Sequence, residues 1–261
     1  MSRVERHSAI LELLGENGRL TVDDLVEVFG TSLATARRDL DELADQQLLT
    51  RTRGGAVAHS VAYDLPLRYK NQEHAAEKGA IARAASAMVP TGSTIALCGG
   101  TTTTAIAQAL ISRPDLMEPS PEPNLTVVTN AINIVVHLAM RPQIKTIITG
   151  GVLHSRSFEV VGTYTEMLLQ KLRLDIAFIG VNGIDDRSGP TAKDEREASV
   201  NTLMAERASH AVIVADSSKI DRVAFATIGH PGLFRTLITD SGITADQRDR
   251  LEGSGLDVVV A

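Results

Sequence analysis

Short β-rich hydrophobic runs alternate with helical patterns over the last two thirds of the chain. Runs of this length that are separated by helices are typical of βα units around a mainly parallel sheet. Seven runs of this kind occur, at 94–98, 125–129, 145–149, 175–179, 211–215, 236–239 and 256–260. We therefore expect residues 75–261 to form an α/β domain whose sheet is open and doubly wound. The four prolines of Pro114–Pro123 predict a surface loop within it.

A second, smaller unit is indicated by the first 58 residues, where the apolar spacing is helical. A first helix is expected over Val4–Leu14, and the glycines at 15 and 18 end it. Thr21 can cap a second helix because Asp24 stands three positions later, as in a capping box. Three apolar residues of this helix are expected to face inward, namely Leu25, Val28 and Phe29. Gly30 supplies the tight turn that follows.

A third helix begins after Thr31 or Ser32, either of which can cap it. Its apolar residues share one face because they recur at spacings of three and four, at Leu33, Ala36, Leu40 and Leu43. At about 100° per residue, three polar side chains point outward instead, namely Thr35, Arg37 and Arg38. Two helices joined by a short glycine turn, the second with exposed cations, form a layout that enters the DNA major groove. Arginine pairs there with guanine edges or with phosphates.

The segment that follows, residues 48–55, alternates and then breaks at two glycines, which predicts a small hairpin wing. Arg51 and Arg53 on this wing are expected to reach the phosphate backbone. The candidate contacts with double-stranded operator DNA are thus Thr21, Ser32, Thr35, Arg37, Arg38, Arg51 and Arg53. The alternative is a three-helix packing module whose arginines form solvated ion pairs with Asp39, Asp41 and Glu42.

Charge and composition restrict how such a unit can bind. The whole chain has a net charge of −6, and residues 1–58 hold ten acidic residues against seven arginines. Contact with DNA therefore depends on a few placed arginines, not on bulk attraction. Because no apolar run reaches the roughly 18 residues of a spanning helix and the start lacks a secretion signal, we expect a cytoplasmic protein without membrane contact. The lone cysteine, Cys98, ends an apolar run and is expected to be buried.

Residues that directly follow the β-rich runs carry the candidate ligand chemistry, because ligands of open α/β sheets bind at the carboxyl ends of the strands. After the first run, Gly99 and Gly100 precede four threonines, and a helix is expected to open at Ala105. Glycines let backbone N–H groups approach an anion, a helix N-terminus adds positive potential, and hydroxyls supply donors. This turn therefore predicts a phosphate cradle, with a simple packing turn as the alternative.

The ends of other runs show small and hydroxyl-binding residues, and Lys219 can neutralise a phosphate. The candidate site comprises Gly99, Gly100, Thr101, Thr102, Thr103, Thr129, Asn130, Gly150, Gly151, Gly180, Asn182, Asp216 and Lys219. Together these residues predict a site for a phosphorylated sugar or polyol. Taken alone, residues 216–219 also fit a helix cap followed by a solvated lysine.

Several stretches carry a family resemblance. In the first unit they are Ser32 to Leu40 with Leu43, and Arg51 to Ala56. In the second unit they are residues 78–82, 100–103, 127–130, 150–151, 161–162 and 216–219. On these residues the chain resembles the DeoR family of bacterial regulators, with one departure at Ala36, where Ile or Val is usual.

This resemblance implies a winged helix-turn-helix over residues 1–58, a linker over 59–74, and an α/β sensor domain over 75–261 similar in fold to ribose-5-phosphate isomerases. Members are typically repressors of carbohydrate-metabolism operons that respond to a phosphorylated sugar. We expect such a repressor to act as a homo-oligomer, a dimer or tetramer, on paired half-sites. Residues Val57–Tyr69 would couple the two domains. Lys78 is expected either in the sugar-phosphate site or in a surface ion pair with Glu77 or a neighbouring acid.

The rival prediction is a sugar-phosphate isomerase with an appended DNA-binding module. Moving a proton between adjacent carbons needs a general base, together with an acid or cation for the oxyanion. The comparable loop here, residues 180–184, holds no carboxylate before Asp185 and Asp186, and residues 193–197 fit an ordinary charged helix start. The histidines show no metal-ligand spacing. We therefore predict a regulator with no catalytic residues, no metal and no cofactor.

Overall fold

The computed structural model describes residues 3–46, 48–57, 74–155, 157–230 and 232–261. The chain separates into two compact units, Met1–Glu73 and His74–Ala261, here called the N-terminal unit and the C-terminal unit. The predicted coupling segment, Val57–Tyr69, lies outside the described residues except for its first residue. The domain boundaries at residues 58 and 75 therefore stay predictions.

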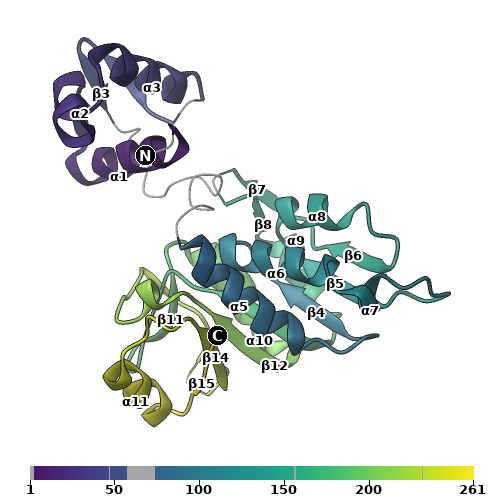
Figure 1. The fold of residues 1–261 in the computed structure, drawn as a ribbon. Coiled ribbons are helices and arrows are strands. Elements are labelled where there is room, and N and C mark those ends of the chain that lie inside the picture. Colours follow the sequence, from purple (N-terminus) through teal and green to yellow (C-terminus); the bar gives the residue numbers. More distant parts are fainter. Residues whose placement is uncertain (1–2, 47, 58–73, 156, 231) are drawn as a thin grey trace. The chain divides into compact units, whose positions relative to one another are not determined.

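In its described residues, the N-terminal unit consists of three helices and a small sheet (Figure 1). The elements are α1 (Arg3–Asn17), β1 (Arg19–Thr21), α2 (Val22–Phe29), α3 (Leu33–Asp45), β2 (Thr50–Thr52) and β3 (Gly55–Val57). The strands are antiparallel in the order β1-β3-β2, so the predicted wing hairpin is confirmed and β1 adds a third strand to it. The core draws apolar residues from all three helices, among them Ile10, Leu14, Leu25, Leu40 and Leu43.

Three details of this unit differ from the sequence prediction. Helix α1 runs to Asn17 instead of residue 14 and ends at Gly18, whose φ of 71° lies in the left-handed region. Val28 was expected inside but is 58% exposed, because the eight-residue α2 buries only a narrow stripe around Leu25. Leu33 is 46% exposed, since it is the first residue of α3 and has no preceding turn of that helix to cover.

Seven parallel strands form the main sheet of the C-terminal unit (Figure 1). Their order across the sheet is β15-β14-β12-β9-β4-β5-β6, and each neighbouring pair is parallel. The strands are β4 (Thr94–Leu97), β5 (Leu125–Thr129), β6 (Ile144–Ile148), β9 (Leu174–Gly180), β12 (Ala208–Val214), β14 (Thr236–Thr239) and β15 (Asp257–Val260). Every predicted β-rich run forms a strand, which confirms the α/β architecture.

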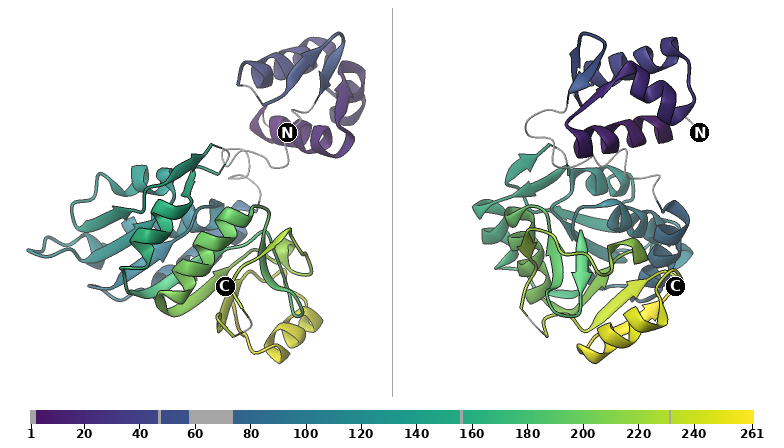
Figure 2. Two further views of the ribbon diagram at one scale, coloured as in Figure 1. Left: turned by 180° about the vertical axis from the view of Figure 1, so that it is seen from behind. Right: turned by 90° about the vertical axis from the view of Figure 1, so that its left-hand side faces the viewer.

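Helices cover both faces of this sheet. Helices α5 (Ala75–Ala87), α6 (Thr101–Ile111) and α8 (Ile132–Leu138) pack on one face (Figure 1). Helices α9 (Thr163–Leu169), α10 (Glu195–Glu206) and α11 (Ala245–Gly253) pack on the other, which Figure 2 shows from behind. Alternate residues along β4 and just beyond it pack in the two cores. Ile95 and Leu97 face α5 and α6, whereas Ala96 and the following Cys98 face α10. Cys98 is fully buried as predicted, and burial raises the pKa of its thiol.

Several short elements were not predicted. They are helix α7 (Pro114–Met117), a hairpin of β7 (Val152–His154) and β8 (Glu159–Val161), a 3₁₀ turn η1 (Ser217–Lys219), and an antiparallel sheet of β10 (Gly183–Asp185), β11 (Gly189–Ala192) and β13 (Ala226–Thr227). Helix α7 corrects the prediction of a loop over residues 114–123. Pro114 stands at its N-terminus, where a missing N–H and a fixed φ favour helix initiation.

The strand order contains one topological switch point, between β4 and β9. From β4 the chain moves outward through β5 to β6, and it then returns to β9 and moves outward on the other side through β12, β14 and β15. The connections that follow β4 and β9 therefore diverge onto opposite faces of the sheet. A crevice opens at the carboxyl ends of such a strand pair, where doubly wound sheets bind ligands.

Candidate functional sites

Local capping interactions hold the helix-turn-helix of the N-terminal unit. Thr21 Oγ1 accepts a hydrogen bond from the Asp24 N–H at 3.1 Å, and the Asp24 carboxylate accepts one from the Thr21 N–H at 2.8 Å. Gly30 ends α2 with a φ of 61° and donates its N–H to the Val26 carbonyl. Ser32, and not Thr31, then caps α3 by accepting from the Thr35 N–H at 3.1 Å. The predicted capping box and glycine turn are thus confirmed, and they fix where α3 starts.

Exposed cations lie on α3 and at the tip of the wing. Arg37 and Arg38 are exposed on α3, opposite the buried Ala36, Leu40 and Leu43. Arg53 is exposed in the turn between β2 and β3. Within the described part of the chain, these three guanidinium groups make no ion pair and no hydrogen bond. Thr35 is half-buried, and its hydroxyl pairs with that of Ser32 at 2.9 Å.

Arg51 differs from these cations because the unit itself uses its guanidinium. Its Nε donates to the Asp41 carboxylate at 2.7 Å and its Nη1 donates to the Gly55 carbonyl at 2.5 Å. These contacts tie the wing to α3. The ion-pair alternative thus holds for the three acids that it named, which pair with arginines other than Arg37 and Arg38: Asp41 with Arg51, Asp39 with Arg6 and Glu42 with Arg3.

A buried ion pair that the sequence reasoning missed joins α1 to α3. Arg6 donates twice to the Asp39 carboxylate, from Nε at 2.5 Å and from Nη2 at 3.0 Å, and His7 Nε2 lies 3.1 Å from the same group. Burial alone would raise the pKa of Asp39, but the hydrogen bonds from Arg6 and His7 outweigh it, and the pKa is lowered. Asp39 therefore serves packing, although it stands beside the outward-facing Arg38.

The glycine turn after β4 lies at the switch point of the sheet. Helix α6 begins at Thr101, which corrects the expected start at Ala105. Backbone N–H groups of the first turn, residues 101–103, have no partner within the helix. The hydroxyls of Thr103 and Thr104 donate back to the Gly100 carbonyl at 3.1 and 2.6 Å, whereas those of Thr101 and Thr102 make no hydrogen bond to any residue that the structure describes.

Residues of the neighbouring β9 meet this turn. A Cβ added at Gly180 would lie 3.6 Å from the Gly99 carbonyl oxygen and 3.9 Å from a methyl carbon of Thr103, so the two strand ends touch. Asn182, just beyond β9, accepts the Lys193 N–H at its side-chain oxygen at 2.9 Å. The switch point thus brings together Gly99, Gly100, Thr103 and Gly180.

The ends of β5 and β6 are occupied mainly by internal contacts. The Thr129 hydroxyl donates to the Leu97 carbonyl at 2.6 Å and accepts the Ala131 N–H. At the end of β6, the Gly150 carbonyl accepts the Thr165 hydroxyl at 2.6 Å, and a Cβ at Gly151 would clash with that same hydroxyl. Gly150 and Gly151 stand two strands from β4, and the structure gives them a packing role against α9.

Asp216 and Lys219 stand on the other side of β9, at the end of β12. Asp216 is buried and caps η1 by accepting from the N–H and the hydroxyl of Ser218. The Ser217 N–H and hydroxyl both donate to Asp240 at 2.6 and 2.9 Å. Lys219 is half-buried, and its ammonium makes no ion pair with any residue whose position is described. The loop is therefore held by internal hydrogen bonds that do not involve the Lys219 ammonium.

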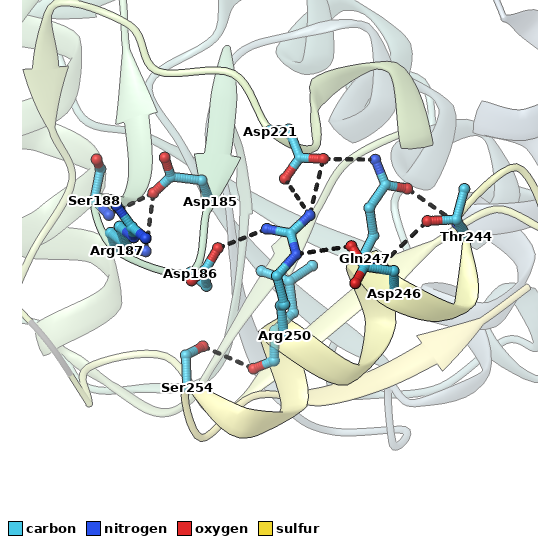
Figure 3. A network of polar contacts seen from close by, with 11 residues as sticks. Asp185, Asp186, Arg187, Ser188, Asp221, Thr244, Asp246, Gln247, Arg250 and Ser254 are labelled. Atoms are coloured by element: carbon cyan, nitrogen blue, oxygen red, sulfur yellow. Dashed lines mark hydrogen bonds and ion pairs between the residues drawn. The ribbon is translucent and has the colours of Figure 1, made fainter.

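A charged network fixes the chain just after Lys219 (Figure 3). Arg250 of α11 donates to Asp221 at 2.8 and 3.0 Å, to Asp186 at 2.7 Å and to Asp246 at 3.0 Å. Hydrogen bonds from Gln247 and Arg250 lower the pKa of Asp221. Asp186 is therefore an ion-pair partner. Its neighbour Asp185 accepts the backbone N–H groups of residues 187 and 188 in the hairpin turn, so both carboxylates that could have suggested catalysis have structural roles.

Glu159 is the site residue that the sequence reasoning missed. It lies on β8, is only 4% exposed, and accepts a hydrogen bond from the Asn130 amide at 2.9 Å and another from the Gly99 N–H. Burial, followed by the negative charge of Glu197, raises the pKa of Glu159 to about 8. No local pattern could have placed it beside Gly99, because β8 reaches this edge only through long-range pairing.

Two further predictions concern side chains outside these groups. Lys78 is buried on α5, so it does not lie on the surface as the ion-pair alternative expected, and its place in the effector site stays a prediction. Among the residues that the structure describes, no group of three histidine, cysteine or acidic side chains could hold a metal ion. Over the same residues, no helix has the length and apolar character needed to span a bilayer.

Comparison with known protein families gives two matches that together span most of the chain. Residues 6–61 match the DeoR-like helix-turn-helix domain. Residues 73–241 match the DeoR C terminal sensor domain.

Characterised relatives align over nearly the full length. The chain is 33% identical to the glycerol-3-phosphate regulon repressor of Escherichia coli K12, over 92% of each chain. It is 34% identical to the HTH-type transcriptional regulator GlpR of Haloferax volcanii, over 99% of this chain and 98% of that one. It is also 34% identical to the transcriptional repressor AccR of Agrobacterium fabrum, over 92% and 91%.

Among solved structures, the ribose 5-phosphate isomerase A of Methanocaldococcus jannaschii aligns with 57% of this chain and 55% of its own. The two are 16% identical, and the TM-score is 0.42. An identity and a TM-score this low carry no information about activity.

Proposed function

This chain belongs to the DeoR family of transcriptional regulators, and from that premise we propose that it represses a carbohydrate-metabolism operon under the control of a phosphorylated sugar or polyol. The family is one of DNA-binding regulators, not enzymes, which confirms the prediction of a helix-turn-helix repressor over that of an isomerase. The structural use of Asp185 and Asp186 agrees with this, because it leaves no general base in the loop after β9.

Operator recognition is assigned to α3 and the wing. Arg37 and Arg38 face away from the core, as a recognition helix in the major groove requires. Arg53 is exposed in the wing turn, and we assign it a contact with a DNA phosphate. Ser32 and Thr21 hold the two helix starts, where backbone N–H groups can also meet phosphates. Because the unit is net acidic, its affinity rests on these few cations.

Effector recognition is assigned to the switch point, and the start of α6 carries this proposal. Where β4 and β9 diverge, three N–H groups of the first helical turn have no helical partner, and two threonine hydroxyls make no hydrogen bond within the described part of the chain. This constellation is suited to a phosphate. Lys219, from the end of β12, supplies the neutralising cation. The E. coli relative is named for the glycerol-3-phosphate regulon, so glycerol 3-phosphate is the first effector to test.

A thermal-unfolding screen of the full-length chain tests this effector site. Glycerol 3-phosphate and hexose phosphates are compared with glycerol, unphosphorylated hexoses and inorganic phosphate. A true effector at a hundred times its dissociation constant stabilises the folded state by about 2.7 kcal/mol. We expect stabilisation only from a compound that carries both phosphate and hydroxyls.

Two variants locate the site. Lys219→Met is expected to abolish the stabilisation by removing the cation for phosphate. The matched control is Lys171→Met, because Lys171 is exposed and lies three residues before β9, at the amino ends of the strands and away from the proposed site. An unchanged response of the Lys219 variant contradicts the site, and no response to any phosphorylated compound contradicts the effector class.

A further inference from the structure

The space beside Gly99 is filled by the protein's own carboxyl group. A Cβ at Gly99 would overlap the carboxyl carbon and one oxygen of Glu159. Any other residue at position 99 would therefore displace that carboxyl. In the sequence, Gly99 suggested space for an anion. In the structure, the Glu159 carboxyl group occupies that space, at the switch point and directly before the first turn of α6.

Glu159 reaches this position because β8 continues the end of β5. Its backbone forms a bridge to Ala131, and the Asn130 carbonyl accepts the Val160 N–H at 2.7 Å. The buried Asn130 side chain donates to Glu159 Oε2, whereas its own oxygen, Oδ1, has no hydrogen-bond partner among the described residues. Buried polar atoms are normally hydrogen-bonded. Asn130 Oδ1, beside the buried Glu159 carboxyl, can therefore still accept a hydrogen bond from a group that enters the site.

The charges that act on Glu159 are mainly negative. From α10, Glu197 and the helix cap Asp194 face it, and both disfavour its ionised form. The nearby cations contact these two acids and not Glu159. His154 Nδ1 of β7 lies 2.7 Å from Glu197 Oε1, and Arg196 Nη2 lies 2.6 Å from Asp194 Oδ2. From β4, Glu159 faces the buried thiol of Cys98. No ion pair of the described chain involves Glu159, so its negative form lacks a compensating cation.

An ionised carboxyl beside a phosphate would repel it strongly in this buried setting, whereas a neutral carboxyl would not. A protonated carboxyl group also gains an O–H donor. The raised pKa of Glu159 means that the neutral form prevails at pH 7. The site therefore presents a neutral acid next to the phosphate cradle at physiological pH.

We propose that Glu159 is part of the effector site, where its neutral carboxyl group hydrogen-bonds a hydroxyl of the effector next to the phosphate, so that effector binding is linked to retention of one proton. This inference rests on the effector site proposed above and specifies it. The ligand must carry a hydroxyl close to its phosphate, and its affinity must fall when Glu159 ionises.

The test is the affinity of the full-length chain for glycerol 3-phosphate between pH 7 and 9.5, measured by titration calorimetry. Phosphate esters have their second pKa near 6, so the ligand stays dianionic over this range. The wild-type affinity is expected to fall about tenfold per pH unit above a midpoint near 8, as linkage to a single proton requires.

Three variants separate this linkage from other titrations. Glu159→Gln keeps a neutral side chain of the same shape, and its affinity should no longer depend on pH. Glu197→Gln removes a facing negative charge, so the midpoint of the wild-type decline should move to lower pH. Glu195→Gln, an exposed residue on the same turn of α10, is the matched control and should keep the wild-type profile.

The outcomes are distinct. If the ligand binds but the Glu159→Gln profile falls as in wild type, this inference is wrong and the proposed function stands. If no phosphorylated polyol binds at any pH, both are wrong.

Unfolding without ligand gives a second measurement. A carboxyl whose folded pKa exceeds its unfolded value makes the folded state bind the extra proton, so the free energy of unfolding should fall as pH rises from about 4.5 to 8 and then level off. Glu159→Gln should remove that decline. If the decline persists in the variant, Glu159 is not the neutral acid.

Discussion

At the level of single residues, neighbouring positions of α3 serve opposite purposes. Arg38 is exposed and makes no ion pair within the described chain, whereas Asp39 is 2% exposed and holds Arg6 and His7. Adjacent residues can face solvent and core because a helix turns by about 100° per residue. The recognition surface and the core contact of α3 can therefore be tested separately.

Replacing Arg38 by alanine should weaken operator binding by about 1–3 kcal/mol if its guanidinium reads a base edge. The residue has no structural partner in the described chain, so stability should stay unchanged. The measurement is a gel-shift titration at fixed salt, with Arg3→Ala as control, since Arg3 is exposed on α1 and pairs with Glu42 on the surface. Equal losses in the two variants would show that Arg38 contributes general charge and not recognition.

Asp39→Asn should destabilise the N-terminal unit by about 2–3 kcal/mol at pH 7, because it weakens a buried, bidentate pair with Arg6. The pKa of Asp39 is lowered in the folded unit, so its contribution is complete above about pH 4 and is lost as pH falls through the folded pKa. The variant and wild type should thus converge once the pH has fallen below the lowered pKa of Asp39. Amide exchange of α1 and α3 measures this, with the exposed Asp45→Asn as control.

Elements whose signals are local could be predicted from the sequence. The capping box at Thr21, the left-handed Gly30 and the cap at Ser32 each depend on residues within four positions, and each was found as expected. The seven β-rich runs likewise form strands, because residues buried on both faces of a parallel sheet stay apolar throughout.

Elements that depend on distant partners could not be predicted. Strands β7 and β8 have three residues each, and what places Glu159 beside Gly99 is the bridge from β8 to Ala131, which no local pattern encodes. The start of α6 was placed four residues late because the threonines at 101–104 disfavour helices, yet two of their hydroxyls bond the Gly100 carbonyl and stabilise the first turn.

Arg250 is expected to hold α11 to two other elements. Arg250→Met should lower the midpoint of thermal unfolding and speed amide exchange over residues 217–221, because three carboxylates lose their shared cation. The control is Arg248→Met on the same helix, whose side chain pairs with Glu252 one turn away and, among the described residues, with no other element. Faster exchange in the Arg250 variant alone would locate the effect in the loop that carries Lys219. Similar behaviour of both variants would contradict the role of the network (Figure 3).

At the scale of the whole molecule, the two units have separate hydrophobic cores. The N-terminal unit has its own core, and the sheet of the C-terminal unit has a core on each face. Recognition of DNA and recognition of an effector therefore rest on different sets of packed residues. Substitutions in one set are expected to leave the fold of the other intact, which makes the variants above interpretable in the full-length chain.

Low positive charge leads to the last prediction, which concerns the number of DNA-binding units. Residues 1–58 are net acidic, and three exposed arginines form the proposed contact surface, so a single half-site offers little affinity. The chain should therefore act as a homo-oligomer on two half-sites whose centres lie about 10 base pairs, or a multiple of that, apart. Joining two such weak contacts raises affinity by about 100-fold or more.

Operator fragments selected from random DNA provide the measurement. A fragment with two half-sites should bind the full-length chain about 100-fold more tightly than one with a single half-site. Inserting about five base pairs between the half-sites turns the second to the opposite face of the duplex and should cancel the gain. Light scattering should give a mass of at least two chains under the same conditions. A monomeric mass, or equal affinity for one and two half-sites, would contradict the oligomer and would require the three arginines alone to supply specific binding.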